Sequence, residues 1–366
     1  MVGRVLVAGA SGVVGSSAIT AFSEAGWDVV SLSRRTPELR PSGSVRHLNV
    51  DLTDKEAASA RLAALEDISH VVFAAVAEAP GLISGWFDTE QMQLNLAMLQ
   101  NCLEPLVESK SNLKHVSIMQ GTKAYGLHIH PLDVPARERS PRDPHPNFYW
   151  LQEDYLKKRS AQVGFNFTIM RPPMVMGGAY GAVMNVAPVL GAYAAICREE
   201  GLPLGFPGGA PYVTEALDAR LLGDALVWAA HAPQARNQHF NITNGDVFEF
   251  RSVWPAIADA LGMEVGPDAP QSLADLLPRK AAVWDEIVRK HKLRPISIEA
   301  LLGESHFVTD FLFGYGLEAP PPPAFISTIK LRKAGFTKVC DTEDMFRYWL
   351  SSFIDRRILP GRIALP

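Results

Sequence analysis

Residues 147–155, NFYWLQEDY, place a phenol and acidic side chains within about two helical turns. A lysine four residues after a tyrosine would share its helical face and set an ammonium beside the phenol, an arrangement suited to hydride chemistry. Tyr149 is followed at that spacing by Glu153, and none of the eight tyrosines has a lysine at this distance. Tyr155 comes nearest, with Arg159 four positions on. A cationic partner for Tyr149 must therefore come from elsewhere in the chain.

Lys123 is the candidate for that partner. It lies in IMQGTKAYG, just past an expected central strand at 113–120. Ligands of open α/β sheets bind outside the carboxyl ends of the strands, so Lys123 and Tyr149 can converge there although 26 positions separate them. A phenol and an ammonium could stabilise charge on a carbonyl oxygen. Taken singly, Tyr149 is equally compatible with a core aromatic and Lys123 with a loop cation.

A glycine-rich turn, GASGVVG, places Gly9, Gly12 and Gly15 between an expected first strand and first helix. Glycine there allows a tight turn and close approach of a pyrophosphate, which the amide groups of the helix N-terminus would bind. The strand before it and the helix after it make the motif more specific than the glycines alone. The turn predicts dinucleotide binding, with a merely structural turn as the alternative.

The second expected strand ends in SLSRRT, which favours NADP(H) over NAD. An acidic residue near this position usually holds the ribose 2′-hydroxyl of NAD, whereas arginine accommodates a 2′-phosphate. Arg34 and Arg35 would take that role, unless they form a solvated basic pair. Asp51 and Leu52 follow the third strand, where an adenine edge could be held, although Asp51 also suits a helix N-cap.

Short β-branched runs alternate with helical segments over the first half of the chain, which predicts parallel βαβ units. We expect a Rossmann-type doubly wound parallel sheet over residues 1–176, carrying the catalytic residues, and a smaller, mostly helical substrate lobe over 177–366. Some segments of the second part are expected to return to the Rossmann core. The proline-rich stretch at 319–325 is expected to act as a stiff connector.

Composition excludes several classes of protein. A net charge of −4 gives no basic surplus for nucleic acid or anionic lipid. The apolar runs fall short of the roughly 20 residues of a membrane-spanning helix, and no secretory signal pattern is present. Three scattered cysteines predict a reducing compartment and no disulfide framework. We expect a cytoplasmic protein without nucleic-acid or membrane partners. The sequence is compatible with a homodimer.

Two further polar groups carry weaker signals. His128, His130 and Asp133 lie in a proline-rich loop without the ligand spacing of a recognisable metal site, so no metal is predicted. Glu153 and Asp154, near the start of the helix that carries Tyr149, are predicted to complement the helix dipole rather than to act in acid–base chemistry.

These segments together resemble the progesterone 5β-reductase and iridoid synthase-like family, an atypical branch of the extended short-chain dehydrogenases. The likeness runs in order over nearly the whole chain, through the glycine turn, SRRT, LKHVSIMQGTKAY, NFYWLQED, RPPMVMG, VMNVAPVLGAYAAIC, NITNGDVF and VWDEIV. It implies NADPH-dependent 1,4-reduction of an activated carbon–carbon double bond. Tyr149 and Lys123 occupy the positions of the family's catalytic pair.

The resemblance also implies a set of cofactor contacts. The residues at the corresponding positions are Ser11, Gly12, Val13, Arg34, Arg35, Asp51, Leu52, Ala75, Met119, Tyr149, Val175, Ala182, Val183 and Met184. The chain departs from the family pattern at Trp150, where a second tyrosine is usual, at Ala124, where a histidine is usual, and at Pro173-Met174, where a glycine-asparagine pair is usual. These departures bear on substrate identity more than on hydride transfer.

The sequence therefore predicts an NADPH-dependent reductase of small apolar enones or enals. Carbonyl reduction or sugar-nucleotide epimerisation is the enzymatic alternative, but those reactions normally use the helical lysine that is missing here. A non-catalytic NADP-sensing module would keep the glycine turn and the arginines without needing the tyrosine–lysine pair.

Overall fold

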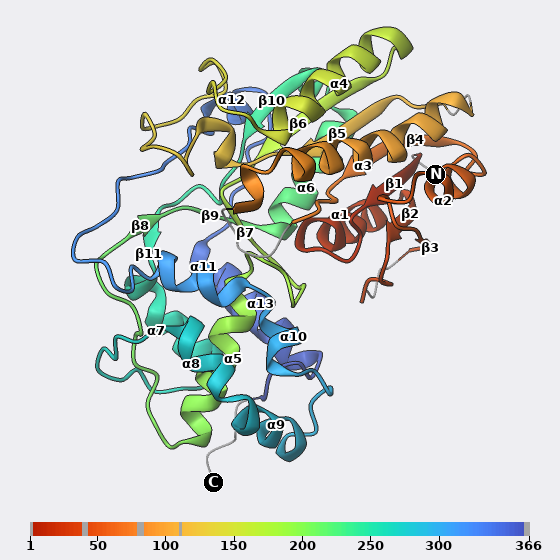
Figure 1. The fold of residues 1–366 in the computed structure, drawn as a ribbon. Coiled ribbons are helices and arrows are strands. Elements are labelled where there is room, and N and C mark those ends of the chain that lie inside the picture. Colours follow the sequence, from red (N-terminus) through yellow and green to blue (C-terminus); the bar gives the residue numbers. More distant parts are fainter. Residues whose placement is uncertain (1–2, 39–42, 79–83, 110–111, 362–366) are drawn as a thin grey trace. The chain divides into compact units, whose positions relative to one another are not determined.

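The computed structural model describes residues 3–38, 43–78, 84–109 and 112–361, drawn in Figure 1. The chain forms two compact units. The first unit contains Met1–Pro173, Ala219–Thr243 and Ile326–Lys338; the second contains Met174–Asp218, Asn244–Phe325 and Val339–Pro366.

A seven-stranded sheet forms the centre of the first unit, in the order β10-β6-β5-β4-β1-β2-β3, and its neighbouring strands are all parallel. The strand order reverses beside β1, which places β4 and β2 on its two sides. The carboxyl ends of strands at such a reversal border a ligand crevice in open α/β sheets. The strands are β1 Arg4–Ala8, β2 Asp28–Ser33, β3 Val45–Asn49, β4 Ile68–Phe73, β5 His115–Met119, β6 Asn166–Arg171 and β10 Gln238–Asn241.

The central strands are mostly buried, because helices cover both sheet faces in this architecture. In β4, every residue of the sequence ISHVVF is buried. Among the helices, α1 packs on α6, and α3 packs on both α2 and α4. The helices of this unit are α1 Val13–Glu24, α2 Lys55–Leu62, η1 Ser84–Trp86, α3 Thr89–Glu108, η2 Thr122–Tyr125, α4 Phe148–Val163, α6 Ala219–His231, η3 Pro233–Ala235 and α12 Ile329–Lys333. The predicted Rossmann-type doubly wound sheet is confirmed.

The second unit is mostly helical. Helix α5 is buried on nearly all sides from Val186 to Cys197, consistent with its almost unbroken apolar sequence. Two small sheets, β7 with β9 and β8 with β11, complete the unit. Its elements are β7 Met174–Met176, α5 Val186–Glu199, β8 Val213–Thr214, β9 Ala216–Asp218, β11 Phe248–Glu249, α7 Phe250–Leu261, α8 Leu273–Arg279, α9 Ala281–Lys290, α10 Ile298–Leu302, α11 Ser305–Leu312 and α13 Thr342–Asp355.

Candidate active site

The glycine turn joins β1 to α1 through backbone contacts that leave no room for side chains. Gly9 has a φ of +82°, and a Cβ there would lie 2.5 Å from the carbonyl of Ala74 at the end of β4. A Cβ on Gly15 would lie 2.2 Å from the Gly9 oxygen. Gly12 is the N-cap of α1 and contributes no side-chain hydrogen bond there. Close backbone packing of this turn therefore requires glycine at positions 9 and 15, and pyrophosphate binding there stays a prediction.

Arg34 and Arg35 follow directly after β2, and both are exposed. Arg34 Nη1 lies 4.0 Å from a carboxylate oxygen of Asp51, which stands after β3. Asp51 accepts hydrogen bonds from the amide and hydroxyl of Thr53, so it closes a turn, whereas the N-cap of α2 is Asp54. The Asp51 carboxylate thus lies near Arg34, and it belongs to the segment after β3 rather than to the end of β2.

The other expected cofactor contacts fall into two groups. Ser11, Val13, Leu52, Ala75 and Met119 all stand at or just beyond the carboxyl ends of strands in the first unit. Val175 and the segment 182–184 belong to the second unit, in β7 and ahead of α5. Their roles as cofactor contacts stay predictions.

Lys123 lies in η2, just beyond the end of the interior strand β5. Its ammonium stands 3.8 Å from the centre of the Trp86 indole ring. The ring of Tyr149, in the first turn of α4, meets the same indole edge-on with ring centres 5.2 Å apart. The ammonium and the phenol, 26 positions apart in the sequence, therefore share one aromatic neighbour.

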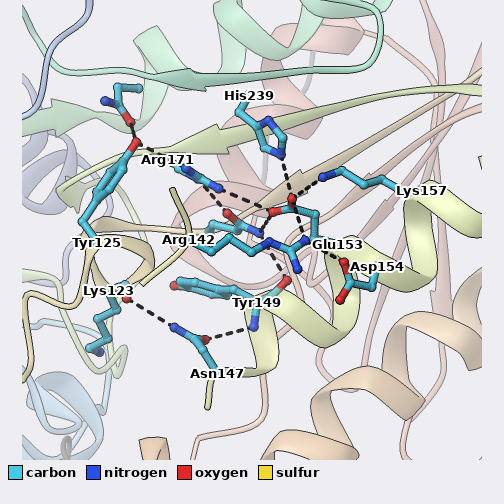
Figure 2. Close-up of polar contacts among 12 residues, drawn as sticks. Lys123, Tyr125, Arg142, Asn147, Tyr149, Glu153, Asp154, Lys157, Arg171 and His239 are labelled. Carbon is cyan, nitrogen blue, oxygen red and sulfur yellow. Dashed lines mark hydrogen bonds and ion pairs between the residues drawn. The ribbon is translucent and has the colours of Figure 1, made fainter. Parts of the chain in front are cut away.

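Backbone contacts of Tyr149 tie it to the segment that carries Lys123 (Figure 2). The side chain of Asn147 caps α4 by accepting a hydrogen bond from the Tyr149 amide at 3.0 Å, and it donates to the Lys123 carbonyl at 3.3 Å. Gln120 donates to the carbonyl of Tyr149 at 3.3 Å. Gly121 lies under the phenol, because a Cβ there would stand 3.3 Å from the hydroxyl oxygen. Gly121 thus leaves space for the Tyr149 hydroxyl.

Burial changes the proton affinity of both groups. Desolvation lowers the pKa of Lys123 to about 8, against a smaller opposite effect of the Glu78 carboxylate. Desolvation also raises the pKa of Tyr149 above its ordinary value, with Glu78 adding to the rise and the Arg171 guanidinium opposing it. At neutral pH the phenol is therefore protonated, and most of the lysine carries its charge.

Glu153 corrects the sequence interpretation that it complements the dipole of α4, because the first turn of that helix holds no acidic residue. Its side chain is 2% exposed. Its carboxylate lies 2.8 Å from Arg142, 2.6 Å from Lys157, 3.4 Å from Arg171 and 3.1 Å from the His239 ring, which lies within ion-pair distance (Figure 2). Glu153 shares a helical face with Leu156 and Ser160, three and seven positions on, and all three are buried. The spacing of Glu153 from the apolar Leu156 was the sequence signal that it faces the interior.

Tyr155 shows what the nearest match to a tyrosine–cation pair does in this fold. Its hydroxyl donates to one Glu104 oxygen at 2.7 Å, and Arg159 donates to the other at 2.6 Å. Glu104 belongs to α3, so Tyr155 and Arg159 join α4 to α3. This pair is a structural bridge away from Lys123 and Tyr149.

Relatives of known function match most of the chain. The NAD dependent epimerase/dehydratase family matches residues 5–243. An (S)-8-oxocitronellyl enol synthase from Catharanthus roseus is 32% identical over 81% of this chain and 79% of its own length. One from Antirrhinum majus is 30% identical over 97% of this chain and 92% of its own.

The chain belongs to the NAD dependent epimerase/dehydratase family, in its progesterone 5β-reductase and iridoid synthase-like branch. Membership makes it an enzyme of the oxidoreductase type in a nicotinamide-dependent family. The fold agrees with solved structures. A UDP-glucose 4-epimerase from Thermotoga maritima in complex with UDP-glucose superposes with a TM-score of 0.64 at 15% identity, over 96% of this chain and 99% of that one. The Thermus thermophilus UDP-glucose 4-epimerase with NAD gives 0.62 at 20% identity, over 96% and 98%.

Two departures from the family pattern lie next to Tyr149 and Lys123 in the sequence. Trp150 is buried, and its indole lies 4.9 Å from the Arg142 guanidinium and 5.8 Å from that of Arg171. Ala124 is buried in η2, directly after Lys123. The Trp150 indole, at the position where the family usually has a tyrosine, therefore packs against two of the cations that surround Glu153.

The histidines of the 128–145 loop contact one another or Asp143. The His128 ring packs edge-on against that of His145, with ring centres 4.9 Å apart. His130 and His145 hydrogen-bond to opposite oxygens of that carboxylate, each at 2.5 Å. Within the described ranges, no three His, Cys, Asp or Glu side chains form a group that could hold a metal ion. In the same ranges, no helix combines the length and apolarity needed to cross a bilayer.

Proposed function

We propose that the protein is an NADPH-dependent reductase that adds hydride in a 1,4 sense to enones or enals. The observation that carries the proposal is the shared contact of Lys123 and Tyr149 with Trp86, at the carboxyl end of β5. The Lys123 ammonium and the Tyr149 ring thus contact the same indole. An ammonium and a protonated phenol are the donor set that a developing enolate oxygen requires.

The glycine turn supports dinucleotide binding on structural grounds. A side chain at Gly9 or Gly15 would clash with the backbone of Ala74 or Gly9 and disturb the turn, and the first turn of α1 would face the pyrophosphate. Arg34 and Arg35 would bind a 2′-phosphate, for which planar guanidinium groups are well suited. When bound, NADPH would supply hydride, which carries both electrons of the reduction, and solvent would supply the proton that turns the enolate into the saturated ketone.

The chain's own residues would stabilise the charge that forms on the substrate. Addition at the β-carbon moves negative charge onto the carbonyl oxygen, and fixed donors in a dry site stabilise that charge best. Tyr149 would donate a hydrogen bond, because burial keeps its phenol protonated. Lys123 would add a positive charge without occupying the helical position that Glu153 takes.

The surroundings of the pair favour a small apolar substrate. Trp86, Met92 and Phe148 form an apolar cluster against which the Tyr149 ring packs. The relatives from Catharanthus roseus and Antirrhinum majus are named for an enol product. The proposal transfers that chemistry, and no particular substrate, to this chain.

NADPH oxidation with a panel of cyclic enones, enals and simple ketones tests the proposal. We expect oxidation with enones and enals and little with simple ketones. Product analysis should find the saturated ketone. An allylic alcohol as the main product would support the carbonyl-reductase alternative, and tight NADPH binding without oxidation across the panel would support the sensing module.

A further inference from the structure

We propose that Glu153 is a positioning residue that holds Tyr149 in register with Lys123, acting through Gln120. The inference rests on the proposed reductase function and concerns the same site. It also assigns a role to Glu153, which occupies the position four residues after Tyr149 where a tyrosine–lysine pair would have its lysine.

Gln120 is the link between the two catalytic segments. It follows β5 directly, is buried, and lies three residues before Lys123. Its side-chain nitrogen donates both to the backbone carbonyl of Tyr149, at 3.3 Å, and to Glu153 Oε2, at 3.2 Å. Any shift of the Glu153 carboxylate therefore disturbs the group that holds the Tyr149 backbone.

The orientation of Gln120 is fixed from its other side by Arg171. Arg171 Nε donates to Gln120 Oε1 at 2.7 Å, and Arg171 Nη2 lies 3.4 Å from Glu153 Oε2. Gln120, Arg171 and Glu153 thus form a closed triangle in which the amide can point only one way. Arg171 ends β6, so the triangle joins β5, β6 and α4.

The buried carboxylate is also the anion that balances the surrounding cations. Burial alone would raise the pKa of Glu153, but His239, Lys157 and Arg142 outweigh that effect and lower it far below its ordinary value. The group is therefore ionised at any working pH. Removing its charge would leave Arg171 without its carboxylate partner and Gln120 without a fixed acceptor.

Asn147 is a second link between Tyr149 and the segment that carries Lys123. It holds the amide of Tyr149 to the Lys123 carbonyl, while Gln120 holds the carbonyl of Tyr149 from the end of β5. Tyr149 is therefore fastened on both sides of its own peptide unit. The Asn147 contact is a local helix cap, whereas Gln120 comes from the end of β5 and is held there by Glu153 and Arg171.

The experiment compares Glu153→Gln, Gln120→Met and their double variant with wild type in enone reduction. Each single change should lower kcat at least tenfold and change the KM for NADPH less than twofold. The double variant should be no slower than the slower single variant, since both changes break the same link. Asp154→Asn is the matched control: this neighbouring carboxylate is exposed and also pairs with Arg142, and its kcat should stay within twofold of wild type.

A second readout does not depend on activity. With 3-fluorotyrosine at position 149, the fluorine NMR line should shift or broaden in Glu153→Gln and in Gln120→Met, and stay unchanged in Asp154→Asn. An unchanged line and unchanged kcat in both variants would overturn the positioning role, as would multiplying losses of kcat in the double variant. If wild type reduces no enone at all, the proposed function fails, and the fluorine result alone decides whether Glu153 positions Tyr149.

Discussion

The glycine turn and the Tyr149 site lie at the same edge of one sheet, but they are built in different ways. The glycine turn is made of backbone from a single short segment, residues 9–15, and closes on the end of β4. The Tyr149 site is made of side chains from η1, the end of β5, η2 and α4, with Arg171 and His239 behind them. A local segment can dictate the first arrangement, whereas only the completed fold can assemble the second.

The same difference explains what the sequence could predict. The glycine spacing and the strand–helix pattern predicted the Rossmann-type sheet, because both signals are local. The convergence of Lys123 and Tyr149 followed from one topological rule about the carboxyl ends of strands. The contacts of Trp86 and Gln120 could not be predicted from the sequence. They depend on the position of the short helix η1 and on the orientation of the Gln120 amide in the completed fold. Glu153 was misjudged because two acidic neighbours near a helix start suggested an interaction with the helix dipole, although both lie beyond the first turn of α4.

The largest expected effect is at the Tyr149 site. Tyr149→Phe and Lys123→Met should each lower kcat for enone reduction by about 10²-fold, the usual loss when one donor to a developing oxyanion is removed. Circular dichroism should show both variants folded. Tyr155→Phe is the control, because that phenol bonds to Glu104 on α3, and its kcat should change less than twofold. Wild-type rates in Tyr149→Phe and Lys123→Met would remove the mechanism.

The next effect concerns the basic end of β2. Replacing Arg34 and Arg35 together by serine should weaken NADPH binding by roughly 10- to 100-fold, because the lost charge-assisted hydrogen bonding of these exposed side chains is worth about 1.4–2.7 kcal/mol in total. Affinity for NADH should stay within twofold, since NADH has no 2′-phosphate. Fluorescence titration with both cofactors measures the difference. Equal losses for the two would mean that the arginines do not select NADPH.

A smaller effect separates cofactor binding from backbone strain. Gly15→Ala places a Cβ against the Gly9 oxygen and should weaken NADPH binding about tenfold, together with a loss of stability of about 1–3 kcal/mol. Gly26→Ala is the matched control. Gly26 has a positive φ, +80°, and open space around it, so the substitution there brings backbone strain without a clash and should cost about 1 kcal/mol and leave the cofactor Kd unchanged. Melting temperature and Kd are measured on both variants, and a normal Kd in Gly15→Ala would place the dinucleotide elsewhere.

The smallest effect is a pH dependence that belongs to the Tyr149 site alone. Because the pKa of Lys123 in the folded protein is about 8, its ammonium loses its proton as the pH rises through that value. The rate of the chemical step should therefore fall about fourfold between pH 7 and pH 8.5. Lys123→Arg should abolish this fall, since a guanidinium stays charged. NADPH affinity should show no matching change, and an identical alkaline fall in Lys123→Arg would assign the titration to another group.

The central claim is that charge develops on a carbonyl oxygen held by Tyr149 and Lys123, so that hydride enters at the β-carbon of the substrate. The most direct measurement uses NADPH carrying deuterium at C4 of the nicotinamide, a cyclic enone as substrate, and NMR analysis of the product. The account predicts a saturated ketone with deuterium at its β-carbon. Deuterium at the former carbonyl carbon of an allylic alcohol would contradict it.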